Sequence, residues 1–257
     1  MDEPVTGKKR RRGIYLLPNL FTTGTLFGGF YAIISAMDGQ FSAACAGILA
    51  AMIADGLDGR IARLTNTSSD FGKEYDSLCD MGAFGFAASI VMYAFSLHYF
   101  AQVHWLGGKL GWAIAFLYAA CAALRLARFN VLASRGGAKG DFFGLPSPAA
   151  AAVVTGFVWA ASESGLPGDN WAVMLLAALT TGAAGILMVS NIRFASFKQV
   201  KIEGRVPFRY IVSMVGLLAL FAMDPPHIFF LVFFGYALSG PVLSLWRRYR
   251  KAPAVQA

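Results

Sequence analysis

The chain has 257 residues, of which 57% are hydrophobic and only 14% are charged. Long apolar runs at this density are typical of a polytopic helical membrane protein and exclude an ordinary soluble domain. The formal net charge of +8 could indicate nucleic-acid binding, but the basic residues lie mostly between the apolar runs, where membrane topology explains them. The three cysteines are scattered and form no CxxC pair, which argues against a disulfide framework or a zinc site.

The apolar runs predict an all-α membrane protein with about eight transmembrane helices. They cover residues 16–37, 41–63, 71–100, 110–133, 147–162, 171–192, 208–223 and 227–246. A basic segment, residues 1–13, precedes the first helix, and a basic tail, residues 247–257, follows the last one.

The basic residues also predict the orientation of the chain. When the connecting loops are assigned alternately to two sides, every one of the 22 Lys and Arg residues except Lys109 falls on the side of the N-terminus. The positive-inside rule makes that side cytoplasmic, so both termini are expected in the cytoplasm and the protein in the inner (cytoplasmic) membrane. Because topology and anionic lipid headgroups account for these charges, no nucleic-acid partner is expected.

Four aspartates interrupt the second and third apolar runs. On helices, Asp55 and Asp58 share a face at i,i+3 spacing, and Gly72, Asp76 and Asp80 share a face at i,i+4 spacing. Two antiparallel helices could therefore point four carboxylates at one another, at the cytoplasmic membrane surface. Ionisable groups at membrane depth are costly and usually mark function. Such a group of charges needs cations, and Mg²⁺ and Mn²⁺ prefer carboxylate oxygens and substrate phosphates.

The residues around these aspartates suit phosphoryl chemistry. A pair of divalent ions can clamp a phosphoryl group during in-line displacement. Arg63 lies one helical turn beyond Gly59 and could bind phosphate, while Gly56 and Gly59 leave room for a nucleotide to approach the backbone. The simpler alternative is that the aspartates pair with nearby arginines and only tie two helices together. Two glycines in the motif are more than a salt bridge needs.

The complete spacing D-x2-D-G-x2-A-R-x8-G-x3-D-x3-D resembles that of the CDP-alcohol phosphotransferases. The matching residues are Asp55, Asp58, Gly59, Ala62, Arg63, Gly72, Asp76 and Asp80. Residues 13–22 (GIYLLPNLFT), 127–130 (ARFN) and 144–149 (GLPSPA) are similar to segments of the phosphatidylserine synthase branch. The resemblance runs from about Arg12 to Lys198.

The resemblance implies an enzyme of phospholipid biosynthesis. Its reaction would transfer the phosphatidyl group of CDP-diacylglycerol to the hydroxyl of L-serine, giving phosphatidylserine and CMP. It also implies two divalent cations, Mg²⁺ or Mn²⁺, and a homodimer in contact with membrane lipids. Residues 14–200 would form a six-helix catalytic core, and residues 201–246 two additional C-terminal transmembrane helices.

The resemblance also assigns roles to residues. One cation would be held by Asp55, Asp58 and Asp76, and the other by Asp55, Asp76 and Asp80. Asp80 would be the general base. The residues expected to contact CDP-diacylglycerol are Pro18, Asn19, Thr22, Gly59, Ala62, Arg63, Ser69 and Gly72.

The acceptor site is expected near the cytoplasmic end of the fourth apolar run. Serine is a zwitterion, so its carboxylate needs a cation, and Arg125 and Arg128 lie there at i,i+3 spacing with Asn130 beside them. One of the two arginines is expected to bind the serine carboxylate; the alternative is that both are positive-inside anchors. Ser147 is a further candidate ligand from the resemblance, although proline chemistry at a helix N-terminus also explains its segment.

Other functions stay open at this point. The same chemistry could serve another acceptor, such as glycerol 3-phosphate, inositol phosphate or choline, although a phosphorylated acceptor would need a denser basic cluster. A cation-coupled membrane transporter is the alternative from a different class. Against it, the charges cluster at one surface, not at the midplane, and no inverted repeat is visible. A structural scaffold would leave the aspartate spacing unexplained.

Overall fold

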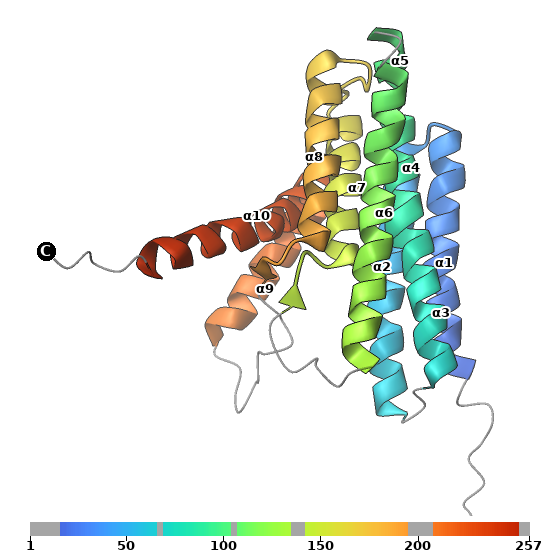
Figure 1. Cartoon of the computed structure of the whole chain (residues 1–257), viewed down its shortest axis with the longest axis vertical. Coiled ribbons are helices and arrows are strands. Elements are labelled where there is room, and N and C mark those ends of the chain that lie inside the picture. The colour runs from blue at the N-terminus through green and yellow to red at the C-terminus, as the bar shows by residue number, and fades with distance from the viewer. Residues whose placement is uncertain (1–15, 66–68, 104–106, 135–141, 195–207, 252–257) are drawn as a thin grey trace, which may run out of the picture.

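The computed structural model describes residues 16–65, 69–103, 107–134, 142–194 and 208–251. The expected basic segment 1–13 and the last residues of the expected tail, 252–257, lie outside this part of the chain. The elements are α1 (Leu16–Met37), α2 (Phe41–Leu64), α3 (Asp70–Asp80), the π-helical segment η2 (Met81–Ala87), α4 (Ala88–Phe95), the short 3-10 turn η3 (Leu97–Tyr99), α5 (Phe100–Val103), α6 (Gly107–Ser134), β1 (Phe142–Phe143), α7 (Ser147–Glu163), α8 (Trp171–Val189), β2 (Arg193–Phe194), α9 (Phe208–Met223) and α10 (Pro225–Lys251). Long helices standing side by side form a bundle (Figure 1).

Six stretches of the described residues are long and apolar enough to cross a membrane. They are Pro18–Met37, Phe41–Ile61, Asp70–Phe95, Gly108–Leu132, Trp171–Val189 and Pro225–Ser244. The other two expected spans fall on α7, with 17 residues, and α9, with 16 residues, which are shorter helices. The structure therefore confirms a helical membrane protein, while the count of eight spans stays a prediction.

The first two helices form a tight hairpin. Gly39, with φ +72°, makes the turn between them, a conformation that side chains with a Cβ rarely adopt. A Cβ on Gly28 of α1 would lie only 2.7 Å from the carbonyl oxygen of Gly47 on α2. Small residues thus let the two backbones approach closely, as is usual between membrane helices. This close packing brings the first half of α1 beside the end of α2 that carries the aspartates.

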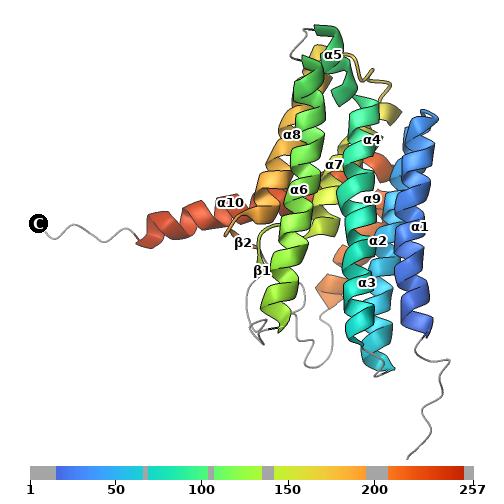
Figure 2. The same cartoon turned by 45° about the vertical axis from the view of Figure 1, so that its right-hand side comes forward.

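The third expected helix is one continuous stretch formed by α3, η2 and α4. It lies between α1 and α6 in both views (Figures 1 and 2). The π-helical turn begins directly after Asp80, and wide turns of this kind are frequent at functional sites. Gly29 of α1 lets η2 pack closely, because a Cβ there would lie 2.5 Å from the Cα of Ala83.

A two-residue β-ladder departs from the all-α expectation. Phe142 of β1 pairs with Phe194 of β2 in antiparallel register. Gly144 follows with φ +82°, and its N–H donates to the carbonyl oxygen of Ile192 at 2.9 Å. The ladder therefore fixes the chain just before Ser147, the first residue of α7. So short a pairing has no alternating pattern by which a sequence could reveal it.

Helix α7 is buried at the centre of the bundle and carries α10 on one side. The ring of Phe157 lies 5.9 Å from that of Phe230, measured between centroids. At the far end of α7, Ser164 Oγ lies 2.9 Å from His227 Nε2, and His227 Nδ1 donates to Asp224 at 2.8 Å, which lowers the pKa of Asp224. From this packed region α10 projects sideways out of the bundle (Figure 1).

Candidate active site

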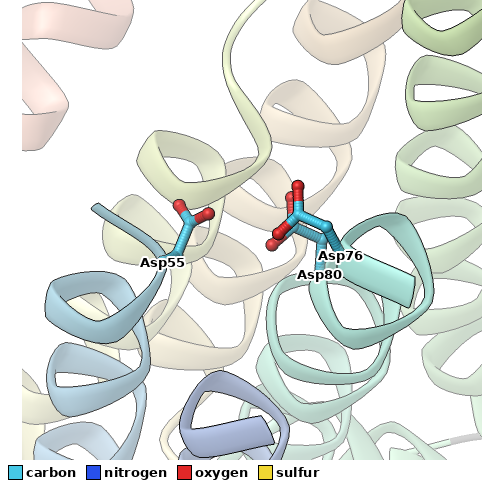
Figure 3. Close-up of side chains that lie close together, drawn as sticks. All are labelled: Asp55, Asp76 and Asp80. Atoms are coloured by element: carbon cyan, nitrogen blue, oxygen red, sulfur yellow. The ribbon is translucent and has the colours of Figure 1, made fainter. Parts of the chain in front are cut away.

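The aspartates lie on the second half of α2 and the second half of α3, two helices that lie side by side at one end of the bundle (Figures 1 and 2). Three of them converge: Asp55 of α2 faces Asp76 and Asp80 of α3 (Figure 3). Each offers a carboxylate oxygen, and these oxygens lie within 4.8 Å of one another. Oxygen donors this close together suit a hard divalent cation. The predicted convergence of the two helix faces is confirmed for these three residues.

Asp80 carries an oxygen that a cation could satisfy. Its Oδ1 is buried and has no hydrogen-bond partner among the described residues. A buried polar atom without a partner costs free energy, and more so when it is charged. A cation between Asp80 and its neighbours would satisfy this oxygen. The residues present therefore fit the metal site that the sequence predicts.

Asp58 is held differently from the other three aspartates. It is buried, with 6% of its surface exposed, and its Oδ2 accepts a hydrogen bond of 2.8 Å from Thr22 Oγ1. The hydroxyl of Thr22 also lies 3.1 Å from the carbonyl oxygen of Pro18. The carboxyl groups of Asp58 and Asp76 are close enough to interact. Asp58 thus lies next to the group of three aspartates, and the hydrogen bond from Thr22 of α1 orients its carboxylate.

The structure separates the two candidate arginines. Arg125 of α6 hydrogen-bonds the hydroxyl of Ser147, and its guanidinium is an electrostatic neighbour of Asp80 and Asp55. Ser147 is fully buried at the start of α7. Arg125 therefore places a positive charge beside Asp80 and Asp55, with Ser147 as its anchor.

Arg128 points to a different part of the molecule. Its Nη2 donates to Asn191 Oδ1 at 2.8 Å, and its Nη1 lies 3.4 Å from the carbonyl oxygen of Val189. Arg128 thus ties α6 to the end of α8. Asn130 is likewise engaged: its Nδ2 donates to Ser77 Oγ of α3 at 3.0 Å. Of the predicted serine-site residues, the structure brings Arg125 and Ser147 together beside the aspartates.

Several expected CDP contacts surround the start of α3. Ser69 caps this helix, because its hydroxyl accepts from the N–H of Gly72 at 3.0 Å. A Cβ on Gly72 would lie 3.2 Å from Ser69 Oγ and 3.6 Å from Asn19 Oδ1, so the absence of a side chain keeps this space open. Asn19, Ser69 and Gly72 are therefore neighbours, as a shared binding surface requires.

The remaining expected CDP contacts lie on α2. No described atom lies within 4 Å of a Cβ placed on Gly59, so its backbone borders open space. Arg63 is exposed, and its Nε donates to the carbonyl oxygen of Gly59 at 2.8 Å. The side chain of Ala62 lies outside the described part of the structure. Pro18 and Thr22 are buried in α1.

Two contacts at this site had no signal in the sequence. Thr23 Oγ1 lies 2.9 Å from the phenol oxygen of Tyr75, which links α1 to α3. Ser77 links α3 to Asn130 of α6. Both partners on α3 are next to Asp76 in sequence, so these links fix the helix that carries two of the aspartates. The family spacing leaves their positions unspecified, which is why the motif alone does not point to them.

Residues 15–185 match the family described as CDP-alcohol phosphatidyltransferase. The chain belongs to this family. All four aspartates, Arg125 and Ser147 lie within the matched residues. Helices α9 and α10 lie beyond them.

Named relatives of this chain are serine O-phosphatidyltransferases. CDP-diacylglycerol–serine O-phosphatidyltransferase of Helicobacter pylori (strain ATCC 700392 / 26695) is 42% identical over 188 residues, which cover 73% of this chain and 75% of the relative. The protein of that name from Mycobacterium bovis (strain ATCC BAA-935 / AF2122/97) is 37% identical over 225 residues, covering 84% of this chain and 73% of the relative. Archaetidylserine synthase of Methanothermobacter thermautotrophicus is 35% identical over 188 residues, covering 72% of both chains.

Proposed function

We propose that this protein is a CDP-diacylglycerol–serine O-phosphatidyltransferase. It transfers the phosphatidyl group of CDP-diacylglycerol to the hydroxyl of L-serine and releases CMP. The observation that carries the proposal is the convergence of Asp55, Asp76 and Asp80 in a chain whose family relatives bear this name. The family supplies the CDP-linked donor, and the names of the relatives supply the acceptor.

Two divalent cations, Mg²⁺ or Mn²⁺, complete the site. Asp55, Asp58 and Asp76 would hold one, and Asp55, Asp76 and Asp80 the other. The second set is the group whose oxygens converge in the structure, and it includes the unpaired Oδ1 of Asp80. When bound, the cations supply positive charge to the diphosphate and to the attacking and leaving oxygens.

Asp80 is the general base of the reaction. Its carboxylate accepts the proton of the serine hydroxyl. The serine oxygen then forms a bond to the β-phosphorus of CDP-diacylglycerol, and the bond from that phosphorus to the bridging oxygen breaks, so that CMP leaves with the electron pair. Arg63 is exposed one turn beyond Gly59, where it can reach the diphosphate.

CDP-diacylglycerol binds along the open side of the two motif helices. The backbone at Gly59 and Gly72 borders space that a side chain would fill, and Asn19 and Ser69 supply polar atoms beside it. Pro18, Thr22 and Ala62 complete the predicted contact set. The acyl chains lie in the surrounding lipid, which the exposed apolar side chains of the outer helices also contact.

Arg125 binds the carboxylate of serine. Its anchor, Ser147, is buried, so the guanidinium is held close to Asp80 and Asp55 and cannot swing away freely. A serine whose carboxylate pairs with Arg125 presents its hydroxyl toward Asp80. Asn130 supports α3 on the same side of the site through Ser77, whereas Arg128 bonds to Asn191 at the end of α8. This arrangement favours an acceptor with one carboxylate over one with a phosphate, which would need several cations.

The site faces the cytoplasm. The placement of basic residues supports eight spans with both termini cytoplasmic, in the inner membrane. Residues 14–200 form the catalytic core, and residues 201–246 add two helices. As in the family generally, the protein is a homodimer. Serine and CMP then exchange with the cytoplasm while both lipids stay in the membrane.

Purified protein in detergent micelles tests the proposal directly. With CDP-diacylglycerol, serine and Mn²⁺, phosphatidylserine and CMP should appear in equal amounts, and both should disappear when the cation is chelated and return when it is added back. The matched control is Arg128→Ala, which leaves the aspartates and Arg125 in place. A protein that binds the cation yet releases no CMP under these conditions would instead support the transporter alternative.

A further inference from the structure

Helix α10 contacts the strand next to the acceptor side of the site. The ring of Tyr236 lies 5.8 Å from that of Phe194, and Phe194 is only 2% exposed. One turn further along α10, a Cβ on Gly240 would lie 2.9 Å from Phe194 Cδ1 and would meet two further atoms of the ring more closely. The glycine is therefore required for this packing, because any larger residue would push the buried ring away.

Phe194 is connected to Arg125 through the β-ladder and Ser147. Phe194 pairs with Phe142 in the β-ladder, and Gly144 bonds back to the same strand region through Ile192. The chain then reaches Ser147, which holds the Arg125 guanidinium. A shift of the Phe194 ring thus moves the ladder that positions the anchor of Arg125.

Tyr236 has a second connection to the same arginine. It is half-buried on α10 and is an electrostatic neighbour of the Arg125 guanidinium. Helix α10 also packs closely on α7. A Cβ on Gly156 of α7 would lie 3.1 Å from the Cα of Phe230 on α10, so the glycine permits this close approach. Helix α10 is therefore docked on α7 at one point and on the ladder at another.

We propose that Tyr236 and Gly240 of α10 are positioning residues for the acceptor side of the site. They hold the ladder, and through it the Arg125–Ser147 pair, in the position that receives the serine carboxylate. This inference rests on the proposed function and extends it to a helix beyond residues 15–185, the part that matches the family. Under it, α10 contributes to acceptor recognition and is more than an additional membrane anchor.

The first test compares two glycine substitutions on one helix. Gly240→Ala places a Cβ against the Phe194 ring, whereas Gly235→Ala places one where no described atom lies within 4 Å. We expect Gly240→Ala to raise the KM for serine about tenfold, and Gly235→Ala to leave it unchanged. The KM for CDP-diacylglycerol should change less than about twofold in both variants, because the donor side is held by α1, α2 and α3.

A second variant keeps the test decisive if Gly240→Ala does not fold. Tyr236→Leu removes the ring that packs on Phe194 and keeps an apolar side chain on α10. Because Tyr236 is only half-buried, the folding of this variant should match that of the wild type in thermal unfolding. We expect it to raise the KM for serine about threefold to tenfold with the KM for CDP-diacylglycerol unchanged.

The outcomes separate the two proposals. A wild-type protein that makes no phosphatidylserine refutes the proposed function itself. If the wild-type protein makes phosphatidylserine, an unchanged KM for serine in Tyr236→Leu and in any folded Gly240→Ala protein refutes the role of α10 alone. A parallel rise of both KM values also refutes it, since that result indicates general loosening of the fold.

Discussion

The hydrogen bond from Thr22 to Asp58, the second aspartate of the motif, should strengthen cation binding at the site. Replacing Thr22 with Val keeps the shape of the side chain but removes the hydroxyl that donates to Asp58 Oδ2 at 2.8 Å. Both residues are almost fully buried, with 4% and 6% of their surfaces exposed, so water cannot easily replace the lost donor. The variant therefore removes one of the hydrogen bonds to a carboxylate inside the protein.

The magnitude follows from the kind of bond that is lost. A hydrogen bond to a charged group is worth about 1.5–3 kcal/mol. We expect Thr22→Val to lower the free energy of unfolding by about this amount and also to weaken cation binding, because Asp58 then loses the hydrogen bond that orients it. Loss of outer-shell partners of metal ligands has effects of about 10- to 100-fold in metalloproteins generally.

Cation titration of the purified protein measures this effect. The midpoint of thermal stabilisation by Mn²⁺ should move to higher concentration in Thr22→Val, and the Mn²⁺ dependence of CMP release should move with it. Thr22→Ser keeps the hydroxyl and is the matched control, with an expected change of less than about threefold.

A different result would support the role in CDP-diacylglycerol binding that the family resemblance implies for Thr22. If Thr22→Val raised the KM for CDP-diacylglycerol and left the Mn²⁺ dependence unchanged, Thr22 would be a donor contact, and the reasoning from its hydrogen bond would be refuted. The reasoning would also be contradicted if Thr22→Val and Thr22→Ser showed the same thermal stabilisation by Mn²⁺ and the same Mn²⁺ dependence of CMP release.

Of three further predictions, two concern the reaction and one concerns the stability of the fold. Asp80→Asn should abolish turnover while CDP-diacylglycerol binding stays largely intact; near-normal turnover would exclude Asp80 as the base. Arg125→Ala should raise the KM for serine at least about tenfold, whereas Arg128→Ala should change it less than about threefold, because Arg128 bonds to Asn191 and Val189; the opposite order in steady-state kinetics would reverse the assignment. Asn130→Ala should lower the thermal unfolding temperature by removing the bond to Ser77, and Asn130→Asp should restore part of it, since a carboxylate can still accept from the Ser77 hydroxyl; full stability of Asn130→Ala would show that this link between α3 and α6 is dispensable.

The convergence of the aspartates could be predicted because it depends on short spacings alone. Residues three or four apart share a helix face, so Asp76 and Asp80 had to point the same way, and an antiparallel neighbour carrying Asp55 could meet them. The CDP-linked substrate could be predicted from the same motif, because the spacing of the motif is specific to the family that it resembles. Local periodicity and a motif were sufficient for this part of the site.

The choice between Arg125 and Arg128 could not be predicted in this way. At i,i+3 spacing the two arginines share a broad face, and the rotation of α6 against its neighbours decides which one meets the aspartates. That rotation depends on tertiary packing, such as the hydrogen bond of 3.0 Å from the buried phenol of Tyr118 to the carbonyl oxygen of Phe84. Such contacts join residues far apart in the chain, and no local pattern reveals them.

Other features were missed for related physical reasons. The bond between Thr22 and Asp58 joins two helices whose relative register is set by glycines at their interface. The β-ladder has only two residues per strand, too few for a strand pattern. The proposed role of α10 depends on Gly240 fitting against Phe194, and an isolated glycine in an apolar helix gives no indication of its partner.

A comparison of acceptors tests the central claim most directly. Purified protein with CDP-diacylglycerol and Mn²⁺ is given serine, glycerol 3-phosphate, inositol phosphate or choline at equal concentrations, and CMP release and the lipid product are measured for each. Serine should support CMP release with phosphatidylserine as the product, at a rate at least about tenfold above any other acceptor. Equal or faster release with another acceptor, or release without phosphatidylserine, would contradict the assignment of serine to the site beside Arg125.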